Sequence, residues 1–316
     1  MKKAAFYTLG CKVNQYETEA MAELFADSGY EIKEFTEVAD VYVINTCSVT
    51  NMGDRKSRQI IRRAKKLNPN AVIAVTGCYA QTAPDEVLAI EGVNLVLGTK
   101  DRKNIVTLVE ELNTESNINH VSDIMSNHEF EELQIKQYSN RTRAFIKIQE
   151  GCNQFCSYCI IPYARGPVRS RAKDDVVREI KELAHNGFKE IILVGIHVAS
   201  YGVDLGDTTL ENLIMDVDKI DGVERIRLSS IEPMTLNQEF IDSIKDSKKL
   251  CHHFHISLQS GCDETLKRMN RKYTTAQFKG IVDGLREAFD DVAITTDIMV
   301  GFPDESDEEF NKTVEF

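Results

Sequence analysis

Three cysteines within eight residues constrain the fold of this chain more than any other feature of its sequence. The segment 151–159, GCNQFCSYC, holds Cys152, Cys156 and Cys159, with Tyr158 directly before the last. Three thiols cannot pair as disulfides without leaving one over. As thiolates they can point inward from one loop and hold three irons of a [4Fe–4S] cube, whose fourth iron stays open for a small molecule. A zinc knuckle is the alternative, but the loop lacks the fourth ligand usual at structural zinc.

The composition is that of a globular protein without export or membrane signals. The chain has 316 residues, of which 42% are hydrophobic and 28% charged, enough for two ordinary domains. No apolar run approaches the roughly 18 residues of a membrane span. The start, MKKAAFYTLGC, runs directly into polar sequence and lacks the apolar core of a signal peptide. We therefore expect no membrane partner and a cytoplasmic location, where eight cysteines stay reduced and serve metal rather than disulfides.

Residues 1–112 alternate short apolar runs with helical patterns. The strands are expected at 3–9, 41–45, 71–75 and 94–97, and the helices at 13–28, 48–67, 84–90 and 102–112. This alternation predicts an α/β domain with a doubly wound parallel sheet. Strands buried on both faces also explain why the apolar runs are continuous.

Three further cysteines each follow one of these expected strands. Cys11 follows YTLG, Cys47 follows YVINT and Cys78 follows IAVTG. The carboxyl ends of parallel strands lie along one edge of a sheet, where ligands bind at the switch in strand order. Gly10 and Gly77 allow tight turns beside two of them. The sequence therefore predicts a second three-thiolate cluster site at this edge.

A polar segment and a second series of elements complete the chain. Residues 113–142 are expected to be a linker with little core of its own. From 143 to 316, strands are expected at 144–149, 190–194, 225–229, 253–258 and 292–300, and helices at 174–186, 209–220, 237–247 and 275–289. Five β/α units in order predict a partial parallel barrel with its site at the carboxyl ends of the strands. A last helix is expected to begin near Pro303.

Two groups of basic residues stand out from a net charge of −12, which itself argues against a simple nucleic-acid binder. The run 55–66, RKSRQIIRRAKK, carries seven positive residues and no negative one. So many like charges repel one another unless an anion is near, although a solvated helix face is the alternative. Arg165, Arg169 and Arg171 follow the cysteine loop and are expected either to face an anion or to lie in an exposed loop.

Three long motifs together resemble one family. GCNQFCSYC followed by IIPYARGPVRSR, the opening TLGCKVNQYE, and HISLQSGCDETLKRMNRKY are similar to the methylthiotransferase family of radical S-adenosylmethionine (SAM) enzymes. The opening LGCKVNQ most resembles the branch that acts on N6-threonylcarbamoyladenosine (t6A) in tRNA. That family has a six-unit barrel and a C-terminal RNA-binding TRAM domain. The resemblance therefore implies a sequence truncated at its C-terminus, without the last barrel unit and the TRAM domain.

The resemblance also implies roles for particular residues. The loop cysteines would hold the SAM-cleaving [4Fe–4S] cluster, and the three earlier cysteines an auxiliary [4Fe–4S] cluster that supplies or carries sulfur. The resemblance also implies that further residues contact SAM. Tyr158, Val300 and Gly301 would lie at the adenine, and Gly195 would lie at the methionine amino group. Ser230 and Glu232 would contact the amino or ribose groups. Gln259 and Ser260 would face the substrate cavity.

The implied reaction is methylthiolation of t6A beside the anticodon to 2-methylthio-t6A, with one SAM as methyl donor and a second as radical source. Both cluster sites would face one cavity. The implied partners are a low-potential electron donor and the tRNA anticodon stem-loop, gripped by Arg55, Arg58, Arg62 and Arg63. Rival interpretations are a sister enzyme acting on isopentenyladenosine in tRNA or on a ribosomal protein aspartate, and a non-enzymatic metal-cluster module that binds RNA.

Overall fold

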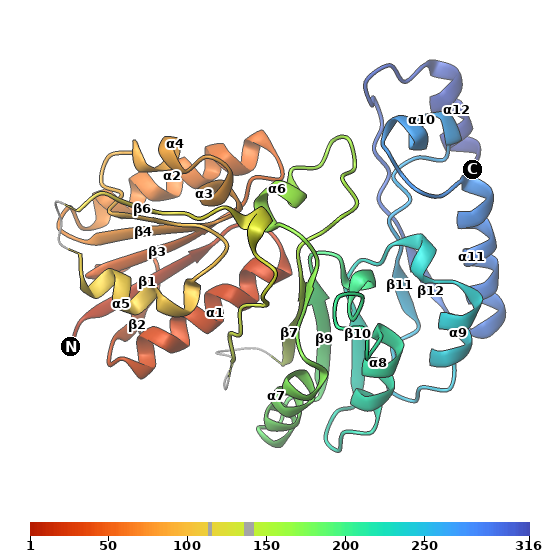
Figure 1. Cartoon of the computed structure of the whole chain (residues 1–316), viewed down its shortest axis with the longest axis horizontal. Helices are drawn as coiled ribbons and strands as arrows, with labels where there is room; N and C mark the ends of the chain where they lie inside the picture. The colour runs from red at the N-terminus through yellow and green to blue at the C-terminus, as the bar shows by residue number, and fades with distance from the viewer. Residues whose placement is uncertain (113–115, 136–141) are drawn as a thin grey trace. The chain divides into compact units, whose positions relative to one another are not determined.

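The structure, a computed structural model, describes residues 1–112, 116–135 and 142–316. The chain folds into two compact units, and each has its own sheet and core (Figure 1). Unit 1 comprises Met1–Ser139 and Ile160–Pro167, and unit 2 comprises Asn140–Cys159 and Val168–Phe316. Within the described ranges, no helix has the length and apolar character needed to cross a membrane.

Unit 1 is built on a six-stranded sheet in the order β2-β1-β3-β4-β5-β6, and each neighbouring pair is parallel. Its strands are β1 (Lys3–Thr8), β2 (Glu31–Lys33), β3 (Val41–Thr46), β4 (Val72–Gly77), β5 (Leu95–Leu97) and β6 (Ile118–His120). The predicted parallel α/β fold is confirmed. The strand order reverses between β1 and β3, which makes the carboxyl ends of these two strands the switch point of the sheet.

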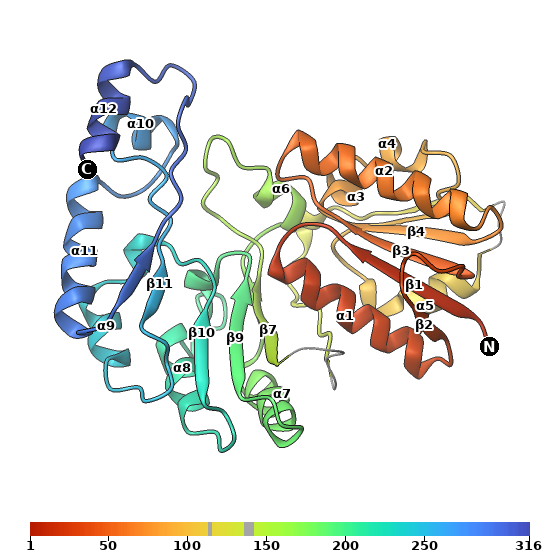
Figure 2. The same ribbon diagram turned by 180° about the vertical axis from the view of Figure 1, so that it is seen from behind.

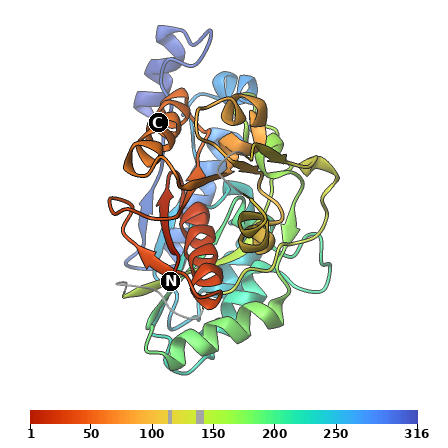
Figure 3. The ribbon, with the colours of Figure 1, turned by 90° about the vertical axis from the view of Figure 1, so that its left-hand side faces the viewer.

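The helical segments of unit 1 pack on both faces of this sheet. They are α1 (Lys12–Asp27), α2 (Asn51–Leu67), α3 (Cys78–Thr82), α4 (Pro84–Leu88), η1 (Arg102–Asn104), α5 (Ile105–Glu110), η2 (Ile124–Ser126) and α6 (Ile161–Arg165). Figures 1, 2 and 3 show α1 and α2 on opposite faces.

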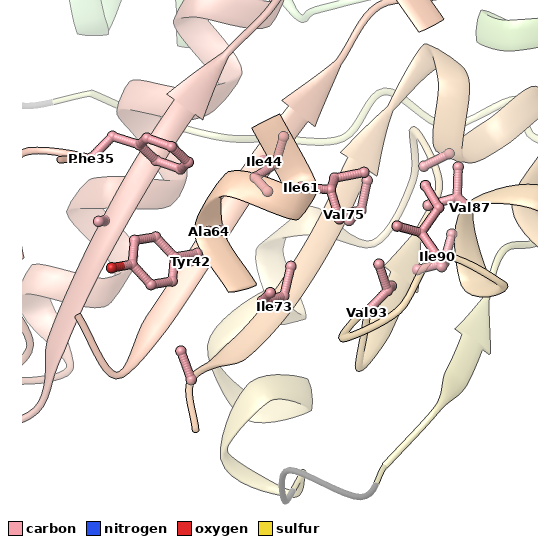
Figure 4. Packing of buried hydrophobic residues seen from close by; sticks show 14 of the residues in the cluster. Phe35, Tyr42, Ile44, Ile61, Ala64, Ile73, Val75, Val87, Ile90 and Val93 are labelled. Carbon is pink, nitrogen blue, oxygen red and sulfur yellow. The ribbon is translucent and has the colours of Figure 1, made fainter. Parts of the chain in front are cut away.

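Successive side chains of a strand point to opposite faces of the sheet, so the strands of unit 1 contribute residues to two separate cores. Tyr42 and Ile44 of β3 pack with Ile61 of α2 in one core, which Figure 4 shows from close by. Val43, between them in sequence, packs with Phe25 of α1 in the other. Burial on both sides of the sheet is what fixes the doubly wound arrangement.

The segment 113–142 is more than the linker predicted from its polarity. Residues 113–115 and 136–141 lie outside the described residues, but β6 between them pairs with β5. Ile124, Leu133 and Ile135 are buried, and the Tyr16 hydroxyl donates to the carbonyl of Leu133. A few apolar residues spaced among polar ones are enough to dock this segment on a sheet edge, and such sparse spacing gives no periodic signal.

Unit 2 contains a curved succession of strands with helices between them. Its strands are β7 (Arg143–Glu150), β8 (Arg169–Ser170), β9 (Glu190–Gly195), β10 (Arg225–Leu228), β11 (His253–His255) and β12 (Ala293–Thr295). Its helical segments are α7 (Lys173–His185), η3 (Val198–Ser200), α8 (Leu210–Asp218), η4 (Pro233–Thr235), α9 (Gln238–Ile244), α10 (Asp263–Arg268), α11 (Thr275–Ala288) and α12 (Asp307–Glu315).

The strands of unit 2 follow the order expected of a partial barrel. One sheet has the order β10-β9-β7-β8, a second pairs β11 with β12, and a parallel bridge between Ile231 and Ile256 joins the segments after β10 and β11. Among the described elements of unit 2, strand β8, which is antiparallel to β7, and helix α10 were not predicted. The last helix begins at Asp307 rather than near Pro303, because Ser306 and Glu309 form a capping box there.

Candidate functional site

The three cysteines of unit 1 leave neighbouring strands at one edge of the sheet. Cys11 precedes α1 just after β1, Cys47 follows β3, and Cys78 opens α3 directly after β4. A Cβ built on Gly10 would lie only 3.0 Å from the sulfur of Cys47, so the loop before Cys11 passes against Cys47. Gly10 has a φ of 103° and Gly77 a φ of 96°, conformations that favour glycine.

Asn14 of α1 ties the first two of these loops together. Its amide Nδ2 donates to the carbonyl of Leu9 at 2.7 Å and to that of Thr46 at 2.9 Å. Its Oδ1 lies 3.7 Å from the sulfur of Cys11. Each carbonyl is close in sequence to a cysteine, so one buried side chain sets the separation of the loops that carry Cys11 and Cys47.

Arg165 brings the third cysteine into the same network. Its Nε donates to the sulfur of Cys78 at 3.3 Å, and its Nη1 donates to Glu17 at 2.7 Å. Burial raises the pKa of the Cys78 thiol, and the guanidinium of Arg165 opposes that rise. The positive charge therefore favours the thiolate form, which is the form that binds metal.

The predicted exposed-loop alternative for the arginines after the cysteine loop is wrong. Arg165, Arg169 and Arg171 are all buried. Arg171 pairs with Glu179 in unit 2. Arg165 contacts Cys78 of the N-terminal triad, although in sequence it follows the other triad. Sequence proximity was misleading because the segment Ile160–Pro167 belongs to unit 1.

The thiols of both triads have the donor chemistry that an iron–sulfur cluster requires. Among the residues that the structure describes, no three His, Cys, Asp or Glu side chains surround one point closely enough to hold a single ion. In a [4Fe–4S] cube each thiolate binds a different iron, so the sulfurs stand farther apart. An all-sulfur donor set on an edge with an arginine facing it fits such an anionic cluster.

The cysteine loop of unit 2 is anchored to the last residue of α10 and to the two residues that follow it. The amide of Ser157 donates to the carbonyl of Met269 at 3.1 Å, and its hydroxyl donates to that of Arg268 at 2.8 Å. Asn270 donates to the carbonyl of Phe155 at 2.8 Å. Burial raises the pKa of Cys152 to about 11, and the two other thiols of the loop add to that rise.

Arg271 connects this loop to Glu232. One guanidinium nitrogen donates to the sulfur of Cys156 at 3.4 Å, and another to the carboxylate of Glu232 at 2.9 Å. Tyr273 accepts from the Nε of Arg271 at 2.9 Å. Burial raises the pKa of Glu232, and Arg271 works against it. The predicted site residue Glu232 is thus an oriented, largely buried carboxylate beside the cysteine loop.

His197 lies near the same oxygen of Glu232 that Arg271 contacts. Its Nε2 is 4.0 Å from the Glu232 carboxylate, and its Nδ1 is 2.7 Å from the hydroxyl of Ser200. Burial lowers the pKa of His197 to about 4, and the charge of Arg271 adds to the effect, so the ring is neutral. The backbone N–H of His197 donates to Gln149, against which Gly195 also packs: a Cβ on Gly195 would lie 2.9 Å from its Oε1.

Other predicted residues lie in three different settings. The ring of Tyr158 packs edge-on against the ring of Phe302, with 6.1 Å between their centroids. Phe302 follows Gly301 in the sequence, and Gly301 has a φ of 73°. Val300 and Ser230 are exposed. Ser260 does not face a cavity as expected: it is fully buried, 3.1 Å from the hydroxyl of Thr313.

A basic groove of about 750 Å³ runs along α2 in unit 1. It is lined by Tyr7, Leu9, Arg55, Lys56, Arg58, Gln59, Ile60, Arg62, Arg63 and Lys66. Arg55, Arg62 and Arg63 are exposed. Arg58 is instead half-buried, and its Nη1 donates to both Tyr79 and Glu86. Leu9 leads to Cys11, so the groove begins beside the cysteine edge.

Sequence reasoning missed Asn14, Glu17, His197 and Arg271. A signal existed for the first two, because they precede Met21 and Phe25 at helical spacing and therefore fall on the core face of α1. Arg271 gave no such signal, since its partners Glu232 and Cys156 lie 39 and 115 residues away.

Two family profiles match the chain, one in each half. The Radical SAM superfamily matches residues 146–316, and uncharacterized protein family UPF0004 matches residues 3–98. Among solved structures, the radical SAM methyltransferase TsrM from Kitasatospora setae aligns over 100% of this chain and 70% of its own, with a TM-score of 0.71 and 16% identity. At that identity the match supports the fold alone.

Similar curated proteins cover the whole chain. The threonylcarbamoyladenosine tRNA methylthiotransferase MtaB of Bacillus subtilis is 50% identical over 100% of this chain and 70% of its own length. MtaB of Aquifex aeolicus is 42% identical over 99% of this chain and 77% of its own. The tRNA-2-methylthio-N(6)-dimethylallyladenosine synthase of Thermoanaerobacter pseudethanolicus is 39% identical over 98% of this chain and 67% of its own.

Proposed function

Because the chain belongs to the tRNA methylthiotransferases of the radical SAM superfamily, we propose that it converts t6A beside the anticodon of tRNA into 2-methylthio-t6A. The observation that carries this proposal is the 50% identity to MtaB of Bacillus subtilis over the full length of this chain. Relatives named for dimethylallyladenosine are 36–39% identical, so the t6A substrate is favoured over that rival.

Two [4Fe–4S] clusters and SAM are the cofactors of this activity. Cys152, Cys156 and Cys159 would hold one cluster in unit 2, and the unit 1 triad would hold the other. When bound, the clusters and SAM supply the methyl group, the sulfur and the radical chemistry that no side chain can provide. The chain's own part is to bind, orient and shield the reactants.

The residues around the unit 2 loop have the chemistry needed to orient SAM. Glu232, fixed by Arg271, offers a carboxylate to an amino group or to ribose hydroxyls. A Cβ at Gly195 would crowd Gln149, so packing within unit 2 requires glycine here, and the proposed contact with the SAM amino group would be made by its backbone. The edge-on pair of Tyr158 and Phe302, with Val300 and Gly301 beside it, offers an apolar wall for adenine.

The groove along α2 has the charge expected of a tRNA contact. Arg55, Arg62 and Arg63 are exposed along it and can bind consecutive phosphates, whereas Arg58 is already engaged by Glu86. Bases of the single-stranded anticodon loop leave their stack at little cost, which suits a recessed reaction site. A low-potential electron donor completes the proposed partners, and the cytoplasm is the proposed location, because tRNA is modified there.

The proposal is tested with reconstituted protein and defined tRNA. Anaerobically reconstituted protein is incubated with SAM, a chemical reductant and tRNA that carries either t6A or isopentenyladenosine, and the digested nucleosides are analysed by mass spectrometry. We expect 2-methylthio-t6A and no product from the second tRNA. A methylthio product on isopentenyladenosine alone, or on neither tRNA, would reject the proposed substrate.

A further inference from the structure

Arg165 is engaged far from its place in the sequence. It stands six positions after Cys159, yet its guanidinium contacts Cys78, which is 87 residues away. The helix that carries it, α6, is held in unit 1 by a hydrogen bond of 2.8 Å from the hydroxyl of Thr99 to the carbonyl of Ala164. The segment Ile160–Pro167 is therefore a part of the unit 1 site supplied by the second half of the chain.

We propose that Arg165 is the positioning residue of the unit 1 cysteine site, where it fixes the sulfur of Cys78 and sets the reduction potential of the cluster bound there. The inference rests on the proposed function only in that the unit 1 triad holds an iron–sulfur cluster. Neither the family match nor the sequence motifs assign this role to Arg165.

The hydrogen bonds of Arg165 fix the orientation of its guanidinium group. Its two terminal nitrogens donate to the two oxygens of Glu17 at 2.7 and 3.2 Å, and one of them also donates to Asn14. Both Arg165 and Glu17 are fully buried. A bidentate pair fixes the plane of a guanidinium, and here that plane directs Nε–H at the sulfur of Cys78.

Arg165 is not needed merely to neutralise the charge of Glu17. Glu17 also pairs with Arg102, and Arg102 pairs in turn with Glu131 at 2.8 Å. The four side chains form a row in which positive and negative charges alternate; Arg165, Glu17 and Arg102 are fully buried, and Glu131 is partly buried at the end of the row. Its Arg165 end faces the thiols, so the row presents a positive charge at the place where an anionic cluster binds.

Hydrogen bonds connect Arg165 to all three cysteine loops, either directly or through one other side chain. It bonds directly to Cys78, and its partner Asn14 donates to the carbonyls of Leu9 and Thr46, which adjoin the loops of Cys11 and Cys47. Hydrogen bonds and positive charge near cluster sulfurs favour the reduced, more negative state. Arg165 should therefore raise the reduction potential of the unit 1 cluster.

The test uses the full chain with the three loop cysteines of unit 2 replaced by alanine, so that only the unit 1 cluster forms. In this background we would compare Arg165→Met, Arg165→Lys, Glu17→Gln and the double variant Arg165→Met/Glu17→Gln. The control is Glu31→Gln/Lys33→Met, which removes the surface pair on β2 whose charged atoms are 2.6 Å apart. The readouts are bound iron and sulfide, and the midpoint potential followed by electron paramagnetic resonance.

The two single variants are expected to move the potential in opposite directions. Arg165→Met should make it more negative and weaken iron binding by about tenfold or more. Glu17→Gln should make it less negative, because the charge of Arg165 is then less compensated. Arg165→Lys should fall between Arg165→Met and the parent, and the control should match the parent.

The double variant separates positioning from folding. It removes both members of a buried ion pair, so it should keep the fold, checked by thermal unfolding of the iron-free protein, even if Arg165→Met does not. We expect its potential to stay more negative than the parent's, because the arginine contacts sulfur and the carboxylate lies behind it. Parent-like iron binding and potential in the double variant would reduce Arg165 to a counter-ion of Glu17 and overturn the proposal. Failure of the proposed function would appear elsewhere, as absence of methylthiolated nucleoside with the unmodified chain.

Discussion

At the scale of single residues, His197 carries the clearest consequence of burial in unit 2. Only 13% of its side chain is exposed, and its lowered pKa of about 4 means that the protonated ring is disfavoured in the folded state. The unfolded chain binds a proton near pH 6.5. The stability that neutral His197 contributes is therefore complete above pH 6.5 and is lost as the pH falls from there toward 4.

Replacement of His197 by Asn should remove this part of the acid sensitivity. Between pH 7 and 4 the iron-free parent should lose about 3 kcal/mol more of its free energy of unfolding than His197→Asn, as measured by urea denaturation at several pH values. His185→Asn, at an exposed position at the end of α7, is the matched control and should keep the parent's pH dependence. Equal pH profiles for parent and His197→Asn would contradict the assigned burial effect.

At the scale of elements, α2 serves two purposes on its two faces. Ile61 and Ala64 pack into the core, while the exposed basic residues form one wall of the groove. Thr50 caps the helix by accepting from the amide of Gly53, and Lys65 and Lys66 occupy the last turn, where positive charge is favourable. Because α2 starts just after Cys47, its basic face extends away from the cysteine edge.

Reversal of charge on α2 should weaken tRNA binding without disturbing the cysteine site. Arg55→Glu/Arg62→Glu should lower the affinity for t6A-containing tRNA and reduce the slope of log affinity against log salt by roughly 0.7–0.9 for each phosphate that the variant no longer neutralises. Binding is measured by filter retention at several salt concentrations. Lys279→Glu on α11, two-thirds exposed, serves as the control. An unchanged salt slope in the double variant would remove α2 from the tRNA interface.

At the scale of the whole molecule, the two triads belong to two units with separate sheets. Cys11, Cys47 and Cys78 are positioned by β1, β3 and β4, and the later triad by the loop after β7, the last residue of α10 and the two residues that follow it. Each network of hydrogen bonds described above closes within its own unit. Removal of one set of thiols therefore leaves intact the hydrogen bonds that hold the other set in place.

Alanine substitution of either triad should remove about half of the bound iron and leave the other cluster in place. The variant without Cys11, Cys47 and Cys78 should still cleave SAM to 5′-deoxyadenosine but make no methylthiolated nucleoside. The variant without the unit 2 triad should do neither. Iron analysis and chromatography of the SAM products test this. Loss of all iron in either variant would show that the two sites depend on one another.

Much of the fold was predictable, because its evidence is local. Apolar runs such as VYVIN marked β3, and helical spacing marked α1 and α2. The two cysteine triads could be predicted as cluster sites because strand ends and loop spacing are read directly from the chain. Short, exposed or edge elements such as β2 and β6 escaped, since three residues at a sheet edge leave no periodic pattern.

The sequence by itself determined which chemistry this chain has available: two sets of three thiols, a basic helix and a parallel α/β framework, each encoded by residues that are neighbours or regularly spaced. Only the tertiary structure decided which charges accompany which thiols. Arg165 follows one triad and contacts the other, and Arg271 joins Glu232 to Cys156 across long separations. Such pairings depend on where the backbone returns in space, and a buried charge is bound to the partner it meets there.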